Sequence, residues 1–385
     1  MNLFCTSCHS GKGHTDQLNL WLTSVGRGDF WGMSAFWSRT TLKRSGATSA
    51  EYYYTIADSA SGNYALGTTT GNKTPRDGKV WAGGETSVTP RFVLGGEAPH
   101  AGEAYRAALA RMVTANPQFA RAAVNYLWRE MFTVGIVEPP WDFDLLRQDA
   151  SQQLPAGWTP QPTHPALLKM LADELAASGF DIRTTLRTLA LSSSYQLSSF
   201  YPAGWKEEYA PLFARHFVRR LRAEEVLDAV TKATSVPAVL NVLDYAVPVA
   251  WAGQLPDGYE PRGTGGTVYR AFLDSYLRGN RDTVPRSSEG SISQALSQLN
   301  STVVTSRVKA STAGSTVAQV VAAKATPEQA VDTLFVATLS RLPTPGERAD
   351  ALAILTALPA GKTFASACED LQFALLNKLD FLFNY

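Results

Sequence analysis

The chain begins with two cysteines three positions apart and a histidine directly after the second: Cys5, Cys8 and His9. This spacing is the attachment pattern of c-type haem, in which each thiol adds across one vinyl group of the porphyrin. The adjacent imidazole then lies under the iron as its proximal ligand. The sequence therefore predicts one covalently bound haem c, held by Cys5 and Cys8 with His9 on the iron.

Two other interpretations of these residues stay open. A Cys-x-x-Cys pair can form a redox disulfide of thioredoxin type, although no βαβ pattern surrounds it here. His14 would complete a set of four possible zinc ligands with Cys5, Cys8 and His9, which makes zinc the stronger rival. The third cysteine, Cys368, lies far along the chain in a helical pattern, and we expect it to be a small buried hydrophobe.

The distal iron ligand has three candidates: Met33, His14 and His100. Met33 follows on a predicted helix and would give a higher reduction potential than a second histidine. His14 stands close after His9, so it would have to loop around the ring, which the glycines between them permit. His100 belongs to the next segment and would fold over the haem. The sequence leaves this choice open.

The elements around the motif follow from periodicity. Phe30, Met33 and Trp37 have helical spacing within residues 29–39, which predicts an apolar face that packs on a haem edge or in the core. Over residues 50–96 the pattern changes. A strand-like Tyr52–Ile56 and short apolar pieces between glycines and prolines predict a small β-rich insert.

From about residue 100 the pattern is helical, with caps, N-terminal prolines and stopping glycines. The predicted helices cover 103–114, 118–134, 166–178, 182–191, 222–234, 267–277, 291–300, 315–323, 328–340, 347–358 and 364–380. We therefore predict a mainly α fold in three parts. These are a haem-attachment segment at 1–48, the β-rich insert at 49–98, and a helical C-terminal domain at 99–385.

Composition excludes some classes of protein. The net charge of +1 predicts no bulk attraction to nucleic acid or to an anionic membrane. No apolar run reaches about 18 residues, so we expect no membrane span. No signal peptide precedes the motif, although haem attachment takes place outside the cytoplasm. We therefore expect the chain to be a piece of a longer exported protein that is periplasmic, on the cell surface or extracellular.

Other polar residues have ordinary interpretations. We expect Asp142 and Asp144, in a proline-rich stretch, to form turns rather than a pair of catalytic carboxylates. His216 lies among arginines and aromatic residues, and we expect it on a solvated helix face. His164 precedes a proline and is expected at a helix start.

Several stretches together resemble a family of large secreted proteins common in planctomycetes and related bacteria, in which a cytochrome-associated domain of unknown function precedes a helical one (the PSCyt–PSD pair). The matching stretches are Asn116–Trp128, His164–Leu168, Ser193–Ser198, Arg219–Glu225, Gln254–Asp257, Arg286–Glu289, Gln294–Asn300, Leu339–Thr344 and Leu376–Phe383. The first 40 residues resemble the tail of the preceding domain, where a Cys-x-x-Cys-His stands shortly before an aromatic stretch, here Ala35–Trp37. One departure is Arg222, where the family often has a small capping residue.

The resemblance implies an exported, haem-bearing protein and supplies no activity, so whether the chain is an enzyme stays open. One hypothesis is electron transfer outside the cytoplasm to a redox partner protein, with the helical domain as scaffold or docking surface. The other is a secreted binding or assembly protein in which the haem is structural and the helical domain binds partner subunits or polysaccharide. A hydrolase with an accessory haem is a third, weaker option.

Overall fold

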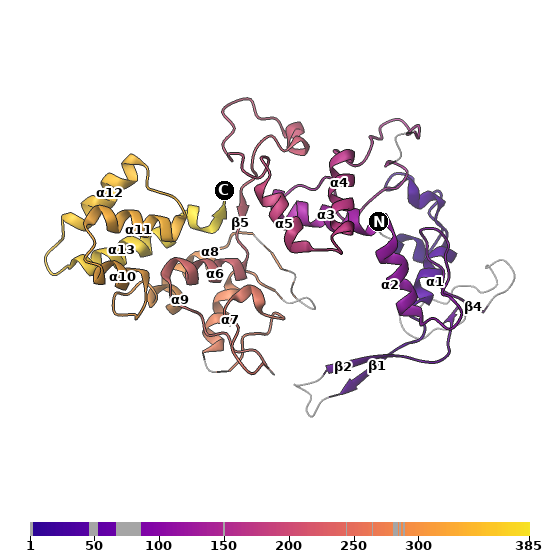
Figure 1. Ribbon diagram of the computed structural model, residues 1–385, viewed down its shortest axis with the longest axis horizontal. Helices are drawn as coiled ribbons and strands as arrows, with labels where there is room; N and C mark the ends of the chain where they lie inside the picture. The colour runs from indigo at the N-terminus through magenta and orange to yellow at the C-terminus, as the bar shows by residue number, and fades with distance from the viewer. Residues whose placement is uncertain are drawn as a thin grey trace. The chain divides into compact units, whose positions relative to one another are not determined.

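The computed structural model describes residues 3–45, 53–66, 86–148, 151–243, 245–263, 265–279, 284, 286–287 and 289–385 (Figure 1). Over these residues it contains thirteen α-helices and three two-stranded antiparallel sheets, which confirms the prediction of a mainly α protein. The chain divides into two compact units, Met1–Phe217 and Val218–Tyr385. This division differs from the predicted boundaries after residues 48 and 98.

The first unit carries the N-terminal motif, two small sheets and four longer helices. Its elements are the 3₁₀ helix η1 (Leu3–Ser7), η2 (Trp21–Ser24), α1 (Arg27–Ala35), β1 (Thr40–Ser45), β2 (Tyr53–Asp58), β3 (Tyr64–Ala65), β4 (Ser87–Val88), α2 (Tyr105–Ala115), α3 (Pro117–Phe132), α4 (Pro165–Ala177), α5 (Ile182–Leu191) and η3 (Glu207–Leu212). β1 pairs with β2, and β3 pairs with β4. The sequence placed its β-rich insert here, but Tyr52 and the glycine- and proline-rich residues 67–85 lie outside the described residues.

Helix α3 forms the centre of the first unit because one of its faces is almost fully buried. Its N-terminus is capped by Asn116, whose side chain accepts a hydrogen bond from the Gln118 amide at 2.9 Å. Trp128 stacks on Phe132 with ring centroids 4.0 Å apart, and both belong to the same buried cluster as leucines of α4. A second cluster joins Met33, from α1, to Phe36, Phe92, Ala108 and Met112.

Two expectations for the first unit are wrong. The predicted α1 face of Phe30, Met33 and Trp37 does not form, because α1 ends at Ala35 and leaves Trp37 56% exposed. The buried positions of α1 are Trp31, Gly32 and Ala35 instead. His216 is 2% exposed and lies outside any helix, with its ring edge-on to Tyr195 at 5.0 Å, so it is a buried residue and not part of a solvated face.

The second unit is a helical assembly around α6, α11 and α13. Its elements are β5 (Arg219–Arg220), α6 (Ala223–Thr234), η4 (Ala252–Gln254), α7 (Gly266–Ser275), α8 (Ile292–Asn300), α9 (Thr302–Thr305), α10 (Thr316–Ala322), α11 (Pro327–Leu339), α12 (Pro345–Thr356), α13 (Phe364–Leu376), η5 (Leu379–Leu382) and β6 (Phe383–Asn384). β5 pairs with β6. Arg222 does not leave α6 without a cap, because the Glu225 carboxylate accepts a hydrogen bond from the Arg222 amide at 2.7 Å.

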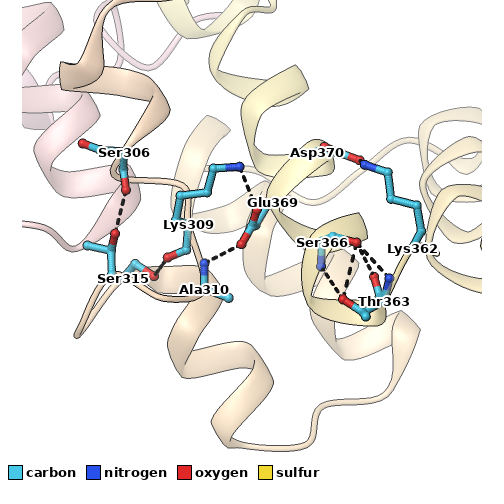
Figure 2. A network of polar contacts seen from close by, with 10 residues as sticks. Ser306, Lys309, Ala310, Ser315, Lys362, Thr363, Ser366, Glu369 and Asp370 are labelled. Atoms are coloured by element: carbon cyan, nitrogen blue, oxygen red, sulfur yellow. Dashed lines mark hydrogen bonds and ion pairs between the residues drawn. The ribbon is translucent and has the colours of Figure 1, made fainter.

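Figure 2 shows polar contacts at the start of helix α13 and between its Glu369 and the segment at residues 309–310. The Glu369 carboxylate accepts hydrogen bonds from the Lys309 ammonium at 2.9 Å and from the Ala310 amide at 2.8 Å. At the helix start, the Thr363 hydroxyl accepts from the Ser366 amide at 3.1 Å. On the buried face, Cys368 has no exposed surface and burial raises the pKa of its thiol to about 11, which confirms it as a small core residue.

Candidate functional site

The cysteine pair lies at the surface, at the end of the 3₁₀ helix η1. Such a helix has about three residues per turn, so positions 5 and 8 fall on the same side of the chain. Cys5 lies within η1 and Cys8 in the turn that follows it, and both side chains are exposed. No disulfide bond joins the two sulfur atoms. Both thiols are thus at the surface, and the Cys8 sulfur lies 3.6 Å from the Ser7 hydroxyl.

His9 is also exposed, and one of its nitrogens has a backbone partner. Its Nδ1 lies 3.3 Å from the carbonyl oxygen of Ser10. With the proton on Nδ1, the ring donates to this carbonyl and presents the Nε2 lone pair for coordination, the arrangement that usually orients a metal-bound imidazole.

The ring of His14 lies directly against that of His9, with centroids 3.7 Å apart and a tilt of 30°. Metal–nitrogen bonds are about 2 Å long, so two axial imidazoles need their ligating nitrogens about 4 Å apart across the porphyrin, with the rings pointing away from each other. The observed stacking leaves no such space. His14 would reach the distal position only after the loop after His9 had rearranged.

The loop after the motif depends on a glycine. The Gly11 amide donates to the Val25 carbonyl at 2.9 Å, and a Cβ added at Gly11 would lie 1.8 Å from the Leu22 carbonyl oxygen. Any side chain at Gly11 would therefore push this part of the loop away from the segment at Leu22. The Thr15 hydroxyl donates to the Gly11 carbonyl at 3.1 Å, and Thr15 is buried.

A buried carboxylate ties this loop to the rest of the first unit. Asp144 is 1% exposed, and its oxygens accept hydrogen bonds from the amides of Leu20 at 2.7 Å and Trp21 at 3.0 Å. Beside it, Asn19 donates to the Asp142 carboxylate at 2.8 Å. Both aspartates lie in a turn region, as predicted, but their long-range contacts were not foreseen, because the partners lie more than a hundred residues away.

Next to the motif lies an apolar pocket of about 350 Å³. Leu3 and Met33 contribute from the N-terminal segment, Phe119 and Tyr126 from α3, and Trp141 from the loop after it. The three aromatic residues are 38%, 46% and 54% exposed. Sequence reasoning missed this pocket, although the aromatic residues of α3 on more than one face of the helix were a usable signal.

The other two distal candidates lie in different surroundings. Met33 lines the pocket, and its sulfur accepts a hydrogen bond from the Val93 amide at 3.3 Å. His100 does not line the pocket; its ring nitrogens lie 3.8 Å from the carboxylates of Glu97 and Glu103, and its side chain is 68% exposed. Of the three candidates, only Met33 lines this pocket.

The possible zinc ligands do not come together as a metal-binding group in the part of the chain that the structure describes. Among the residues that the structure describes, no group of three or more histidine, cysteine or acidic side chains is placed to hold a metal ion. The set Cys5, Cys8, His9 and His14 is therefore not assembled as a zinc site. Within the same described residues, no helix combines the length and apolar character that crossing a membrane requires.

One family model matches the stretch of the chain from α2 to α6. Residues 105–242 match PSD1, a family described as a protein of unknown function (DUF1553). This match confirms the PSD-type resemblance for that part of the chain. It ends at Val242, whereas the sequence-based domain extends to residue 385. No curated protein and no solved structure matches the chain.

Proposed function

We propose that this chain is an exported c-type haem protein that transfers electrons outside the cytoplasm. The observation that carries the proposal is that Cys5, Cys8 and His9 are all exposed within one short turn. A maturation enzyme must bring the haem vinyl groups to both thiols, and a redox partner must approach the haem edge. The approach of a redox partner requires this exposure.

The residues present fit a c-type haem. Cys5 and Cys8 would hold the porphyrin through thioether bonds, and His9 would coordinate the iron with its ring oriented by the Ser10 carbonyl. The bound haem would supply a one-electron couple. Asp144 would keep the segment after the motif fixed on the first unit, so that the haem does not move with a loose chain end.

The alternative, a structural haem that clips the N-terminal segment in place, is less well supported. Residues 19–21 are already held by the buried carboxylate of Asp144 and by the bond from Asn19 to Asp142. The segment therefore does not depend on a cofactor for its attachment at this point. This favours electron transfer over a structural clip.

We expect a reversible one-electron couple when the protein is produced by export in cells with the c-type maturation enzymes. Redox titration followed by absorbance measures the couple, and rapid mixing with a small hydrophilic reductant measures access to the haem edge. If the protein transfers electrons, its haem should be reduced fully and rapidly, and reoxidised fully and rapidly. A covalent haem that is reduced only after the protein unfolds would contradict electron transfer and support the structural alternative.

A further inference from the structure

We propose that the apolar pocket beside the motif seats the tethered porphyrin, with the Met33 sulfur as the sixth ligand of the iron. This inference rests on the proposed function and adds where the ring lies and which side chain completes the coordination.

The tether begins at the edge of the pocket. Leu3 lines the pocket and belongs to the same 3₁₀ helix as Cys5. With a rise of about 2 Å per residue, the two positions are about 4 Å apart along the helix axis. A porphyrin bonded to the Cys5 sulfur must lie within the reach of one thioether link. The pocket lined by Leu3 is therefore close to the tether along the chain.

The walls suit one face of a flat, apolar ring. Phe119, Tyr126 and Trp141 present partly exposed aromatic surface around the opening. Exposed apolar surface gathered in one place commonly marks a binding site. The volume of about 350 Å³ is near the lower end of the range for cofactor pockets, so part of the ring would remain outside and reachable by a redox partner.

One amide in the wall has no hydrogen-bond partner in the described structure. Both polar atoms of the Gln118 side chain, Nε2 and Oε1, are buried and unpaired. A buried amide in that state costs free energy unless a ligand completes its hydrogen bonds. After a small shift of the Gln118 side chain toward the pocket, a haem propionate would accept from Nε2 at one end of the porphyrin.

Met33 is the candidate ligand that this placement selects. Met33 lines the pocket, and the hydrogen bond from the Val93 amide to its sulfur is weak because a thioether is a poor acceptor. Iron can therefore displace that bond at little cost. The ring of His14 lies against that of His9, which is the proposed proximal ligand. His100 does not line the pocket, and its ring faces the carboxylates of Glu97 and Glu103.

The test compares the purified, exported wild-type protein with Met33→Leu, Met33→His and Met112→Leu. Met112 is the matched control, because it belongs to the same apolar cluster as Met33 but does not line the pocket. We expect the wild type and Met112→Leu to show the red charge-transfer band of a methionine–ferric haem bond. Met33→Leu should lose this band and bind carbon monoxide readily. Met33→His should regain six-coordination at a lower reduction potential.

Each other outcome overturns the inference. If the alkaline pyridine spectrum shows covalent haem but the wild type lacks the band, or Met33→Leu keeps it, the sixth ligand is another group and the proposed function stands. If Met112→Leu loses the band together with Met33→Leu, the effect comes from packing and not from ligation. If the same samples contain no covalent haem, the proposed function fails as well.

Discussion

Replacing both motif thiols, in Cys5→Ser/Cys8→Ser, is expected to abolish covalent haem completely. Each thioether bond consumes one vinyl group, so the single variants should keep one link and show a pyridine haemochrome spectrum shifted toward that of unmodified haem. The double variant should release all of its haem into acidified organic solvent. The measurement is the alkaline pyridine spectrum before and after that extraction.

The third cysteine gives the control for this series. Cys368→Ser also removes a thiol, but this residue is buried in α13 and should leave the haem content unchanged. Equal haem content in the wild type and the double variant would contradict the attachment site. Zinc found in the wild type in place of haem, and lost in the double variant, would support the rival interpretation.

The Asp144→Ala variant is expected to lower the free energy of unfolding of the first unit by about 2–4 kcal/mol. It removes the acceptor of the part-buried amides of Leu20 and Trp21, and each lost partner costs about 1–2 kcal/mol. Urea unfolding measures the loss. In hydrogen exchange, the amide protons of Leu20 and Trp21 should exchange faster than the amide protons in the helices of that unit.

The neighbouring aspartate provides a matched control for Asp144. Asp142 accepts one side-chain hydrogen bond, from Asn19, and is less deeply buried. Asp142→Ala should therefore cost only about 1 kcal/mol. Equal losses in the two variants would show that Asp144 has no special part in holding the N-terminal segment.

Much of the helical structure could be predicted because its signals are local. Helix α5 begins and ends where its Asp181 cap and apolar spacing predicted, at Ile182–Leu191. Thr326 and Thr344, each followed by proline, mark the starts of α11 and α12. A cap and the turn that it starts lie within four residues, so the sequence alone shows both partners.

The candidate site was predictable only in part, because its environment depends on distant contacts. The motif residues are recognised from their spacing, but the partners of Asp144 are 123 and 124 positions away. The pocket likewise combines Leu3 with Trp141. The predicted apolar face of α1 was wrong because the helical spacing was extended through Trp37. The helix ends two residues earlier, at Ala35.

The central claim is that a porphyrin is bonded to the sulfur atoms of Cys5 and Cys8. It is tested most directly by mass spectrometry of the tryptic peptide that ends at Lys12, taken from protein exported with the c-type maturation enzymes. We predict a peptide that carries one haem through both cysteines, with neither thiol open to alkylation. The same peptide recovered without haem, with two alkylated thiols or a disulfide bond, would contradict the claim.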